Sequence, residues 1–289
     1  MNRYLALQKI VELGNFTRAA EVVGCTQSAI SQMIASLEDE LRIKLLNRSR
    51  NGVTLTKEGQ EIFPHIEKLV YEYRAVLERA REIRGLEIGT IRIGTMGSIS
   101  AHWLPMLMKE FKQHYPAIEF VLLQGDYVSI SEWIKSGAVD FGFVNPDAVS
   151  GLRTMPVKDG RMLAVLPPNH PLAALEVVPL KELVSEQFIL LEEGHYSEPL
   201  VAFKSLGLEP DIRYTIHDDY TIMNMVEAGL GVSMMAELML QRIDYHLSLR
   251  PTDPPVIRKM CIGYKDRLSL TTAARRFIDL LKSRMQELP

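Results

Sequence analysis

The sequence predicts an α/β protein built of three successive parts: a group of short helices closed by a hairpin, one long helix, and a larger region of alternating strands and helices. Apolar residues recur at helical spacing in three short segments before residue 42 and keep a heptad spacing from residue 62 to residue 83. After residue 89, short apolar runs alternate with amphipathic segments. At roughly 100–200 residues per domain, the chain is long enough for about two or three domains.

The composition favours a folded, water-soluble chain. Hydrophobic residues make up 47% and charged residues 24%, which argues against disorder. The two cysteines, Cys25 and Cys261, lie far apart, so neither a disulfide framework nor a zinc ribbon is indicated. The first residues lack a signal-peptide core, and no apolar run reaches the ~18 residues of a membrane span. These features predict a cytoplasmic protein without membrane association.

Three helices are predicted within the first 41 residues. The first covers residues 4–13 and stops at Gly14; the second is capped by Thr17 and ends at Gly24. The third begins beyond Thr26, a further N-cap residue, with only Cys25 between the second stop and this cap. Two helices joined so tightly must cross at a steep angle, which predicts a helix-turn-helix.

The third helix has an unusual exposed face. Its apolar residues form one stripe, and the opposite face carries small or polar uncharged residues: Gln27, Ser28, Ser31, Gln32 and Ala35. Short amide and hydroxyl groups suit base edges, where glutamine can pair with adenine and serine with either kind of base. A merely neutral helix face fits the helical pattern equally well.

The segment after the third helix favours the nucleic-acid interpretation. Five basic residues and no acidic one occur between residues 41 and 57: Arg42, Lys44, Arg48, Arg50 and Lys57. Within it, residues 50–52 form a turn signal before an alternating segment, which predicts a hairpin wing. Basic wings contact phosphates and position a protein, whereas base contacts select the site. Residues 1–57 carry a net charge of +3, residues 58–86 carry −1 and the remainder −5, which together give the overall −3.

Residues 16–59, FTRAAEVVGCTQSAISQMIASLEDELRIKLLNRSRNGVTLTKEG, resemble the winged helix-turn-helix of the LysR-type transcriptional regulators, and the similarity continues along the chain. The sequence departs from the family at Ile43, where glycine is usual, at Leu46, where phenylalanine is common, and at Gln32, where arginine is frequent. The resemblance implies that one set of side chains contacts DNA: Thr26, Gln27, Ser28, Ser31, Gln32, Arg48, Arg50 and Thr56.

Residues 57–84 read as one long helix of about 42 Å. Its apolar residues are spaced alternately four and three apart, which favours a coiled seam between two copies of the chain over packing on its own domain. Pro64 should bend the helix or mark a later start. The predicted dimerisation residues are Ile62, Ile66, Leu69, Tyr73, Val76 and Ile83.

The remaining residues predict mainly parallel sheets with helices on both faces. Expected strands cover residues 90–94, 118–123, 140–144, 162–166, 188–191, 212–216, 232–235 and 258–264, and expected helices cover 98–114, 129–136, 197–206, 220–228 and 271–286. The resemblance implies a two-subdomain effector domain like a type 2 periplasmic binding protein. Its domain boundaries are 1–57 for the DNA-binding domain, 58–86 for the linker helix, 87–162 with 265–289 for subdomain I, and 163–264 for subdomain II.

A glycine-rich strand-to-helix turn at residues 94–100 is the first candidate ligand site, because open α/β sheets bind ligands at strand ends. By resemblance it is where the family binds an effector, often a carboxylate; a turn with ordinary helix caps is the structural alternative. The candidate effector residues are Thr95, Met96, Gly97, Ser98, Ser100, Gln124, Asn145, His195, Tyr196, Asp219 and Thr221. If two or more of Glu192, Glu193, Asp218 and Asp219 line the cleft, a cation, an amine or a neutral polyol would be preferred.

Enzyme signatures are missing from the sequence. There is no complete dinucleotide or P-loop fingerprint, no H-x-x-x-H spacing and no nucleophile elbow. We therefore expect a non-enzymatic, sequence-specific transcriptional regulator with no metal or cofactor. Its expected partners are double-stranded DNA, a small-molecule effector, further copies of itself in a dimer or tetramer, and RNA polymerase. The alternative is an enzyme or solute-binding domain of the same sheet architecture with an accessory helix-turn-helix.

Overall fold

A computed structural model describes residues 1–49, 52–83, 88–266 and 270–289 of the chain. The chain forms two compact units. The first contains Met1–Gly85 with Ser136–Ala138, and the second contains Leu86–Lys135 and Val139–Pro289.

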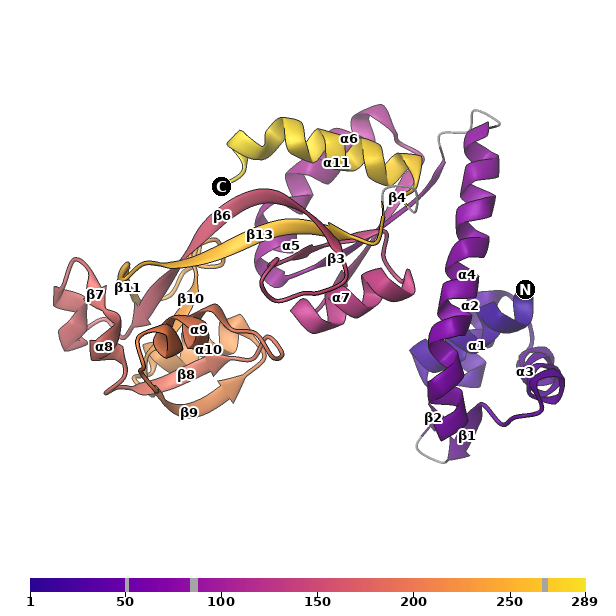
Figure 1. Cartoon of the computed structure of the whole chain (residues 1–289), viewed down its shortest axis with the longest axis horizontal. Helices are drawn as coiled ribbons and strands as arrows, with labels where there is room; N and C mark the ends of the chain where they lie inside the picture. The colour runs from indigo at the N-terminus through magenta and orange to yellow at the C-terminus, as the bar shows by residue number, and fades with distance from the viewer. Residues whose placement is uncertain (50–51, 84–87, 267–269) are drawn as a thin grey trace. The chain divides into compact units, whose positions relative to one another are not determined.

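The first unit begins with three helices joined by tight turns (Figure 1). Helix α1 spans Asn2–Leu13, α2 spans Phe16–Val23 and α3 spans Gln27–Leu41, which confirms the predicted order. Gly14 and Gly24 end the first two helices with φ of 61° and 77°, a left-handed conformation that glycine adopts without a Cβ penalty. The apolar faces of all three helices meet in one core.

Two local details differ from expectation. Helix α2 is capped by Asn15 rather than Thr17: the Asn15 side-chain oxygen accepts hydrogen bonds from the backbone N–H groups of Thr17 at 2.8 Å and Arg18 at 3.1 Å. Helix α3 ends at Arg42 with φ 56°, so the left-handed position that suits glycine is residue 42. Ile43, noted above as standing where the family usually has glycine, does not need this conformation and packs against the core.

The predicted hairpin is present. Strands β1 (Leu46–Ser49) and β2 (Gly52–Leu55) pair antiparallel, and α4 follows from Lys57 to Ile83. Of the two alternatives for Pro64, the later start of this helix is wrong, because the proline lies inside the helix. The Thr56 hydroxyl accepts a hydrogen bond from the Gly59 backbone N–H at 2.9 Å and thereby caps the helix start.

The second unit contains a sheet whose described strands follow the order β10-β6-β13-β5-β3-β4, with β11 also pairing with β6. Strand β3 runs parallel to β4 and β5, whereas β13, β6, β10 and β11 pair antiparallel. The expectation of mainly parallel strands therefore holds for only part of this sheet. The strands are β3 (Gly89–Thr95), β4 (Ile118–Gln124), β5 (Phe141–Val144), β6 (Arg153–Leu166), β10 (Ser233–Ala236), β11 (Ser248–Arg250) and β13 (Val256–Tyr264).

Two long strands join the two halves of this unit. Strands β6 and β13 pair from Val256↔Met162 to Tyr264↔Arg153, and Figure 1 shows them running side by side between two groups of helices. Only residues 162–166 of β6 were expected, because residues 153–161 have no buried apolar run. The subdomain boundary predicted at residues 162 and 163 falls inside β6.

The first group of helices surrounds β3, β4 and β5. It consists of α5 (Gly97–His102), α6 (Leu104–His114), α7 (Tyr127–Ser136) and the C-terminal α11 (Thr272–Arg284). Phe111, Phe141 and Phe277 pack in its core, so the end of the chain returns to this subdomain as the resemblance implied. The single helix expected over residues 98–114 is two helices, because a proline occupies the first turn of α6, where its missing N–H costs nothing.

The second group is built around parallel strands β8 (Gln187–Leu191) and β9 (Asp211–Ile216), with α9 (Glu198–Ser205) and α10 (Asp219–Glu227). Phe188 and Val226 belong to its two apolar clusters. Five short elements were not predicted, because two to four residues are too few for a periodic pattern to show: η1 (Pro171–Ala174), β7 (Val178–Pro179), α8 (Leu180–Leu183), β11 (Ser248–Arg250) and β12 (Thr252–Asp253). The 3₁₀ helix η2 (Met285–Glu287) overlaps the end of the helix expected over residues 271–286.

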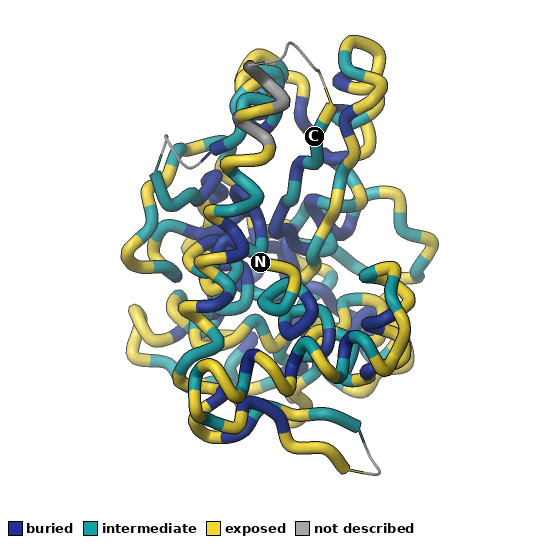
Figure 2. The backbone as a smooth tube through the Cα atoms, turned by 90° about the vertical axis from the view of Figure 1, so that its right-hand side faces the viewer, coloured by how far each residue is buried: buried dark blue, intermediate teal, exposed yellow. Residues whose placement is uncertain are grey.

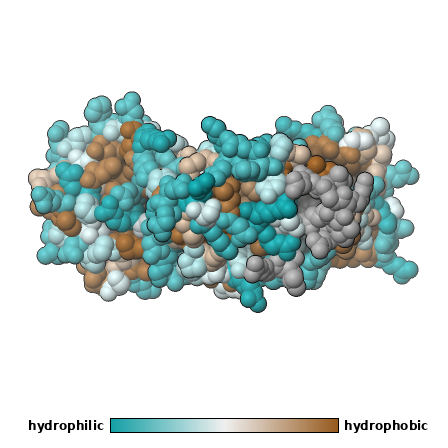
Figure 3. Space-filling model, turned by 90° about the horizontal axis from the view of Figure 1, so that it is seen from above, coloured by the Kyte–Doolittle hydropathy of each residue, from teal (hydrophilic) through white to brown (hydrophobic). Residues whose placement is uncertain are grey.

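Buried and exposed residues alternate along the helices (Figure 2). On the face shown in Figure 3, hydrophilic side chains predominate and hydrophobic ones form separate patches. Among the described residues, no helix is both long and apolar enough to cross a membrane.

Candidate nucleic-acid interface and ligand cavity

The outward face of α3 presents the polar side chains expected there. Gln27, Ser28 and Gln32 are exposed and Ser31 is half-buried, while Ile30 and Ile34 point into the core. The Gln27 amide donates a hydrogen bond to the Ser31 hydroxyl at 3.4 Å. Donors and acceptors on one helical face can meet the edges of base pairs in a major groove.

Two threonines of the predicted DNA-binding set form hydrogen bonds within their own domain. The Thr26 hydroxyl accepts a hydrogen bond from the Ala29 N–H at 3.2 Å and caps α3. Thr56 is buried, and its hydroxyl donates to the Lys44 carbonyl at 2.6 Å. Thr56 was therefore wrongly placed in the DNA-contacting set: it joins the wing to α4, and its backbone N–H is bonded to the Leu45 carbonyl.

The wing places Arg48 at the surface, with its guanidinium 4.2 Å above the centre of the Phe16 ring. Stacking on an aromatic face limits the motion of a long cation and aims it outward. Arg50, the second predicted phosphate contact, lies outside the described residues.

Glu38 fastens the wing to α3. Its carboxylate accepts hydrogen bonds from the backbone N–H groups of Leu45 at 2.8 Å and Leu46 at 3.3 Å, and it pairs with Lys44 at 2.8 Å. Burial raises the pKa of Glu38, but these hydrogen bonds outweigh burial and hold the pKa below its ordinary value.

We expect Glu38→Gln to lower the free energy of unfolding by about 1–2 kcal/mol at neutral pH. Because the folded-state pKa is lowered, the stabilisation by the wild-type carboxylate is present above about pH 4.5 and is lost as the pH falls through the lowered folded-state value. Denaturant unfolding of the wild type and of Glu38→Gln measures both free energies of unfolding. The difference between them should be smaller at acidic pH than at neutral pH. Glu40→Gln on the same helix is the control, because its carboxylate pairs with Arg3 at the surface; an equal loss in both variants would contradict the assigned role of Glu38.

The predicted dimerisation residues of α4 fall into two groups, which differ in their burial within the chain. Ile66 is buried in the core of its own domain and Ile62 is half-buried against that core, so both pack within the chain, which the prediction did not expect. Further along, Leu69 and Val76 are 42% and 65% exposed, and Tyr73 is half-buried. The side chain of Ile83 lies outside the described residues.

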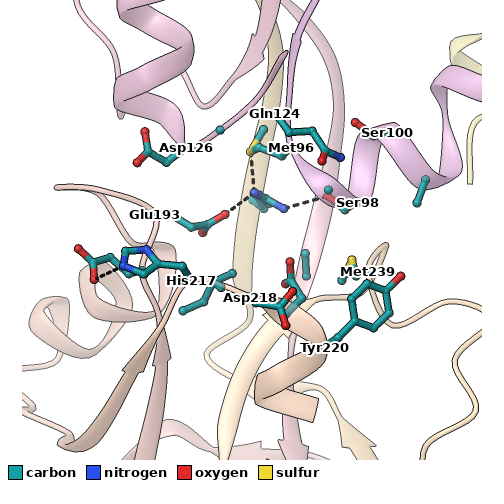
Figure 4. Close-up of a pocket in the computed structure, with 18 of the residues that line it drawn as sticks. Met96, Ser98, Ser100, Gln124, Asp126, Glu193, His217, Asp218, Tyr220 and Met239 are labelled. Atoms are coloured by element: carbon teal, nitrogen blue, oxygen red, sulfur yellow. Dashed lines mark hydrogen bonds and ion pairs between the residues drawn. The ribbon is translucent and has the colours of Figure 1, made fainter. Parts of the chain in front are cut away.

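A cavity of about 640 Å³ opens in the second unit between the start of α5 and the start of α10. Its lining includes six of the predicted effector residues: Met96, Gly97, Ser98, Ser100, Gln124 and Asp219. Figure 4 shows Ser98, Ser100 and Gln124 on one side of this space and Asp218 and Tyr220 on the other. The cavity size falls within the range of small-molecule sites.

Five predicted effector residues do not line this cavity. Thr95 and Asn145 are fully buried, and Thr221 bonds the Asp218 carboxylate through its backbone N–H and its hydroxyl. His195 lines a separate pocket beside α9, and Tyr196 packs edge-on against Tyr127. The structure therefore gives these five residues no place in the lining of this cavity, because local sequence cannot show which side of a loop faces it.

Arg258 of β13 lies at the centre of the site and was not anticipated. Its guanidinium contacts Glu193 at 2.8 Å, donates to the Tyr127 hydroxyl at 2.8 Å and donates to the Ser98 hydroxyl at 3.4 Å. In Figure 4, Glu193, Ser98 and Met96 converge on this guanidinium. No local sequence motif predicts the position of this arginine, because its partners are 60 or more residues away along the chain.

Behind Arg258 lies a second buried carboxylate, Glu198. One of its oxygens accepts hydrogen bonds from Tyr127 at 2.7 Å and Asn145 at 2.8 Å and lies 3.9 Å from the arginine. Burial raises the pKa of Tyr127 well above its ordinary value, so the phenol keeps its proton and donates to Glu198. Burial also raises the pKa of Glu193 to about 7, against the opposing effect of Arg258.

Comparison with known families decides the class of this chain. The bacterial regulatory helix-turn-helix domain of the lysR family matches residues 1–60, and the LysR substrate binding domain matches residues 84–286. The chain belongs to the LysR family. It is a LysR-type transcriptional regulator with a helix-turn-helix domain and an effector-binding domain, as the sequence predicted.

Individual relatives agree with this LysR assignment. The chain is 33% identical over 277 residues to YvbU of Bacillus subtilis (strain 168), an uncharacterized HTH-type transcriptional regulator, covering 95% of this chain and 94% of the relative. It is 31% identical over 214 residues to the transcriptional dual regulator GltC of the same organism, covering 73% and 71%.

Solved structures share the fold of this LysR-type regulator. A full-length OxyR variant from Pseudomonas aeruginosa superposes with a TM-score of 0.73 at 22% identity, covering 99% of this chain and 93% of that one. HinK, a LysR family transcriptional regulator from the same organism, superposes with a TM-score of 0.62 at 25% identity, covering 99% and 98%.

The structure of this LysR-type regulator also shows whether the four acidic residues considered above line the cavity. All four of Glu192, Glu193, Asp218 and Asp219 line the cavity, and Asp126 joins them. Among the described residues, no group of three or more histidine, cysteine or acidic side chains is arranged to hold a metal ion.

Proposed function

We propose that this LysR-type regulator binds DNA as a dimer through α3 and the wing, and that an effector in the cavity beside Arg258 changes how it binds. The observation that carries the proposal is the pairing, in one chain, of an exposed uncharged polar helix face beside a basic wing with a 640 Å³ cavity in the effector-binding domain. Gln27, Ser28, Ser31 and Gln32 read bases, and Arg48 contacts the phosphate backbone.

The exposed part of α4 supports self-association. Leu69 and Val76 are seven residues apart and therefore lie on one stripe, and both are exposed. Burying this stripe against a second copy would place two recognition helices on successive half-sites of a DNA duplex. Further assembly into a tetramer and contact with RNA polymerase belong to the same proposal.

The cavity is suited to regulation because it draws residues from both halves of the second unit. Ser98 and Gln124 come from one half, Asp219 and Tyr220 from the other, and Arg258 from a strand that joins them. A ligand regulates only if it binds one arrangement of the two halves better than another. The protein then works at DNA in the cytoplasm, without catalysing a reaction and without a cofactor beyond the effector.

We expect Gln27→Ala to weaken discrimination among duplexes by about 1–3 kcal/mol, because the amide can make paired hydrogen bonds to a base edge. We expect Arg48→Ala to weaken binding to all duplexes by a similar factor and to reduce the salt dependence, because a phosphate contact carries no sequence information. Binding of each variant to a duplex selected from a random pool, and to scrambled duplexes at matched salt, measures both effects.

Thermal unfolding of both variants provides the control for folding, since Arg48 also packs on Phe16. Equal affinity of the unmodified protein for selected and scrambled duplexes would contradict sequence-specific DNA binding and the regulation proposed from it. Turnover of a metabolite that also stabilises the protein thermally would favour the enzyme alternative instead.

A further inference from the structure

We infer that the effector is an organic cation, a molecule carrying an ammonium or guanidinium group on an apolar frame, and that Asp219 and Glu193 hold its charged end. This inference rests on the proposed function of the cavity as the effector site. It names the chemical class that this cavity selects.

The charges around the cavity are predominantly negative. Five carboxylates line it, from Asp126, Glu192, Glu193, Asp218 and Asp219, whereas the cationic or basic side chains among the described lining residues are Arg258 and His217. A carboxylate ligand would enter a site that already holds an excess of negative charge. A cationic ligand would instead supply positive charge to a site in which carboxylates outnumber the positive side chains.

Arg258 is not available to a ligand carboxylate. Its three nitrogens contact Tyr127, Ser98 and Glu193, and Glu198 lies 3.9 Å behind it. A carboxylate could occupy the guanidinium only by displacing Glu193 and leaving that side chain unpaired in a buried place. Breaking a buried pair in this way is strongly unfavourable.

Most of the lining carboxylates also have partners. Glu192 lies 3.4 Å from the His217 ring, Asp218 caps α10 through Thr221, and Asp126 accepts a hydrogen bond from the Ser129 N–H at 2.7 Å. Asp219 is different, because its carboxylate forms no ion pair within the described part of the chain. The carboxylate faces the start of α5: a Cβ placed on Gly97 would lie 3.8 Å from one of its oxygens.

The protonation behaviour of the site agrees with a missing cation. Burial raises the pKa of Asp219, and burial together with Glu198, Asp219 and Asp126 raises that of Glu193 to about 7 despite Arg258. A bound cation would favour the ionised carboxylates, so binding should release protons near neutral pH. His217 and Glu192 also face this space, but they lie at its exposed rim.

The rest of the lining suits an apolar frame. Met96, Met162, Leu191 and Met239 supply apolar surface, and the Tyr220 ring, half-exposed at the edge, can face a cation. Ser98, Ser100 and Gln124 offer polar groups on the opposite wall (Figure 4). A short aliphatic or aromatic amine matches this combination.

Two sets of probes matched in shape test the inference on the full chain: cadaverine, pentanediol and glutarate, and benzylamine, benzyl alcohol and benzoate. We expect isothermal titration at about pH 8 to show binding of the amine in at least one set and a weaker response, or none, to the alcohol and carboxylate of that set. Affinity should decrease as the pH falls below about 7, with proton release seen as a dependence of the binding enthalpy on the buffer.

Asp219→Asn should weaken amine binding roughly tenfold or more, because it removes a charge and keeps the shape. Asp279→Asn on exposed α11 is the matched control and should bind as the wild type does. The inference is overturned if the carboxylates bind as well as the amines, if no amine binds better than its alcohol, or if Asp219→Asn leaves amine binding unchanged. The proposed regulatory function would fail on a separate measurement, the loss of preference for a selected duplex, whichever charge the cavity prefers.

Discussion

Arg258→Ala is expected to lower the free energy of unfolding by about 3–5 kcal/mol, the usual cost of removing one partner from a buried ion pair. The side chain is 7% exposed and lies between Glu193 and Glu198. Without it, two buried carboxylates face each other with no cation between them, and the Tyr127 hydroxyl loses a donor.

The pH dependence of this loss follows from the same geometry. Burial already raises the pKa of Glu193 to about 7 with Arg258 in place, and removal of the guanidinium should raise it further. Glu193 is then destabilising when ionised, so the deficit of the variant should be largest above about pH 7 and smaller in acid, where the carboxyl group is protonated.

Chemical denaturation of Arg258→Ala at two pH values measures both effects. The matched control is Arg161→Ala, which removes a pair with Glu237 at 2.7 Å whose side chains are largely exposed, and which should cost at most about 1 kcal/mol. Addition of Glu193→Gln to Arg258→Ala should recover part of the loss, because it removes the unpaired charge. An Arg258→Ala protein as stable as the Arg161→Ala control would show that the buried network does not support the fold.

If the chain forms the proposed dimer through α4, Leu69→Asp is expected to convert that dimer into monomers. Leu69 and Val76 lie on one exposed stripe of α4, and a carboxylate at residue 69 would have to be desolvated in an intermolecular seam. Each monomer would then present one recognition helix, so affinity for a two-half-site duplex should fall at least about tenfold through loss of effective concentration.

Light scattering and duplex titration of Leu69→Asp measure these two consequences. Lys68→Asp on the neighbouring exposed position is the control for an added acidic side chain and should leave the oligomer intact. If Leu69→Asp has the same mass in solution as the wild type, α4 does not form the interface. Ile62→Asp would be a poor test, because Ile62 packs against the core of its own domain and an aspartate there would also destabilise that domain.

Local sequence was sufficient for the DNA-binding unit because its elements are short and sharply bounded. Gly14 and Gly24 end two helices in the left-handed conformation, Thr26 caps the third, and the hairpin follows directly. Each of these features depends on neighbours within a few residues. The errors were local too: Asn15 competes with Thr17 for the same cap, and Arg42 takes a conformation that a glycine would adopt more easily.

The charge of the effector cavity, and which residues pair around it, could be determined only from the tertiary structure. The strand-to-helix pattern and the family resemblance were enough to place the turn carrying Met96 and Ser98 at a ligand site and to ask whether the acidic residues line it. The charge of that site could not be decided, because Arg258, Glu193, Glu198 and Tyr127 lie on segments separated by up to 131 residues. They meet only because β13 pairs with β6 along its length and carries Arg258 between the two halves. Sequence periodicity reports burial and element type, whereas these charges meet across the cavity only when segments far apart in the sequence pair in a definite register.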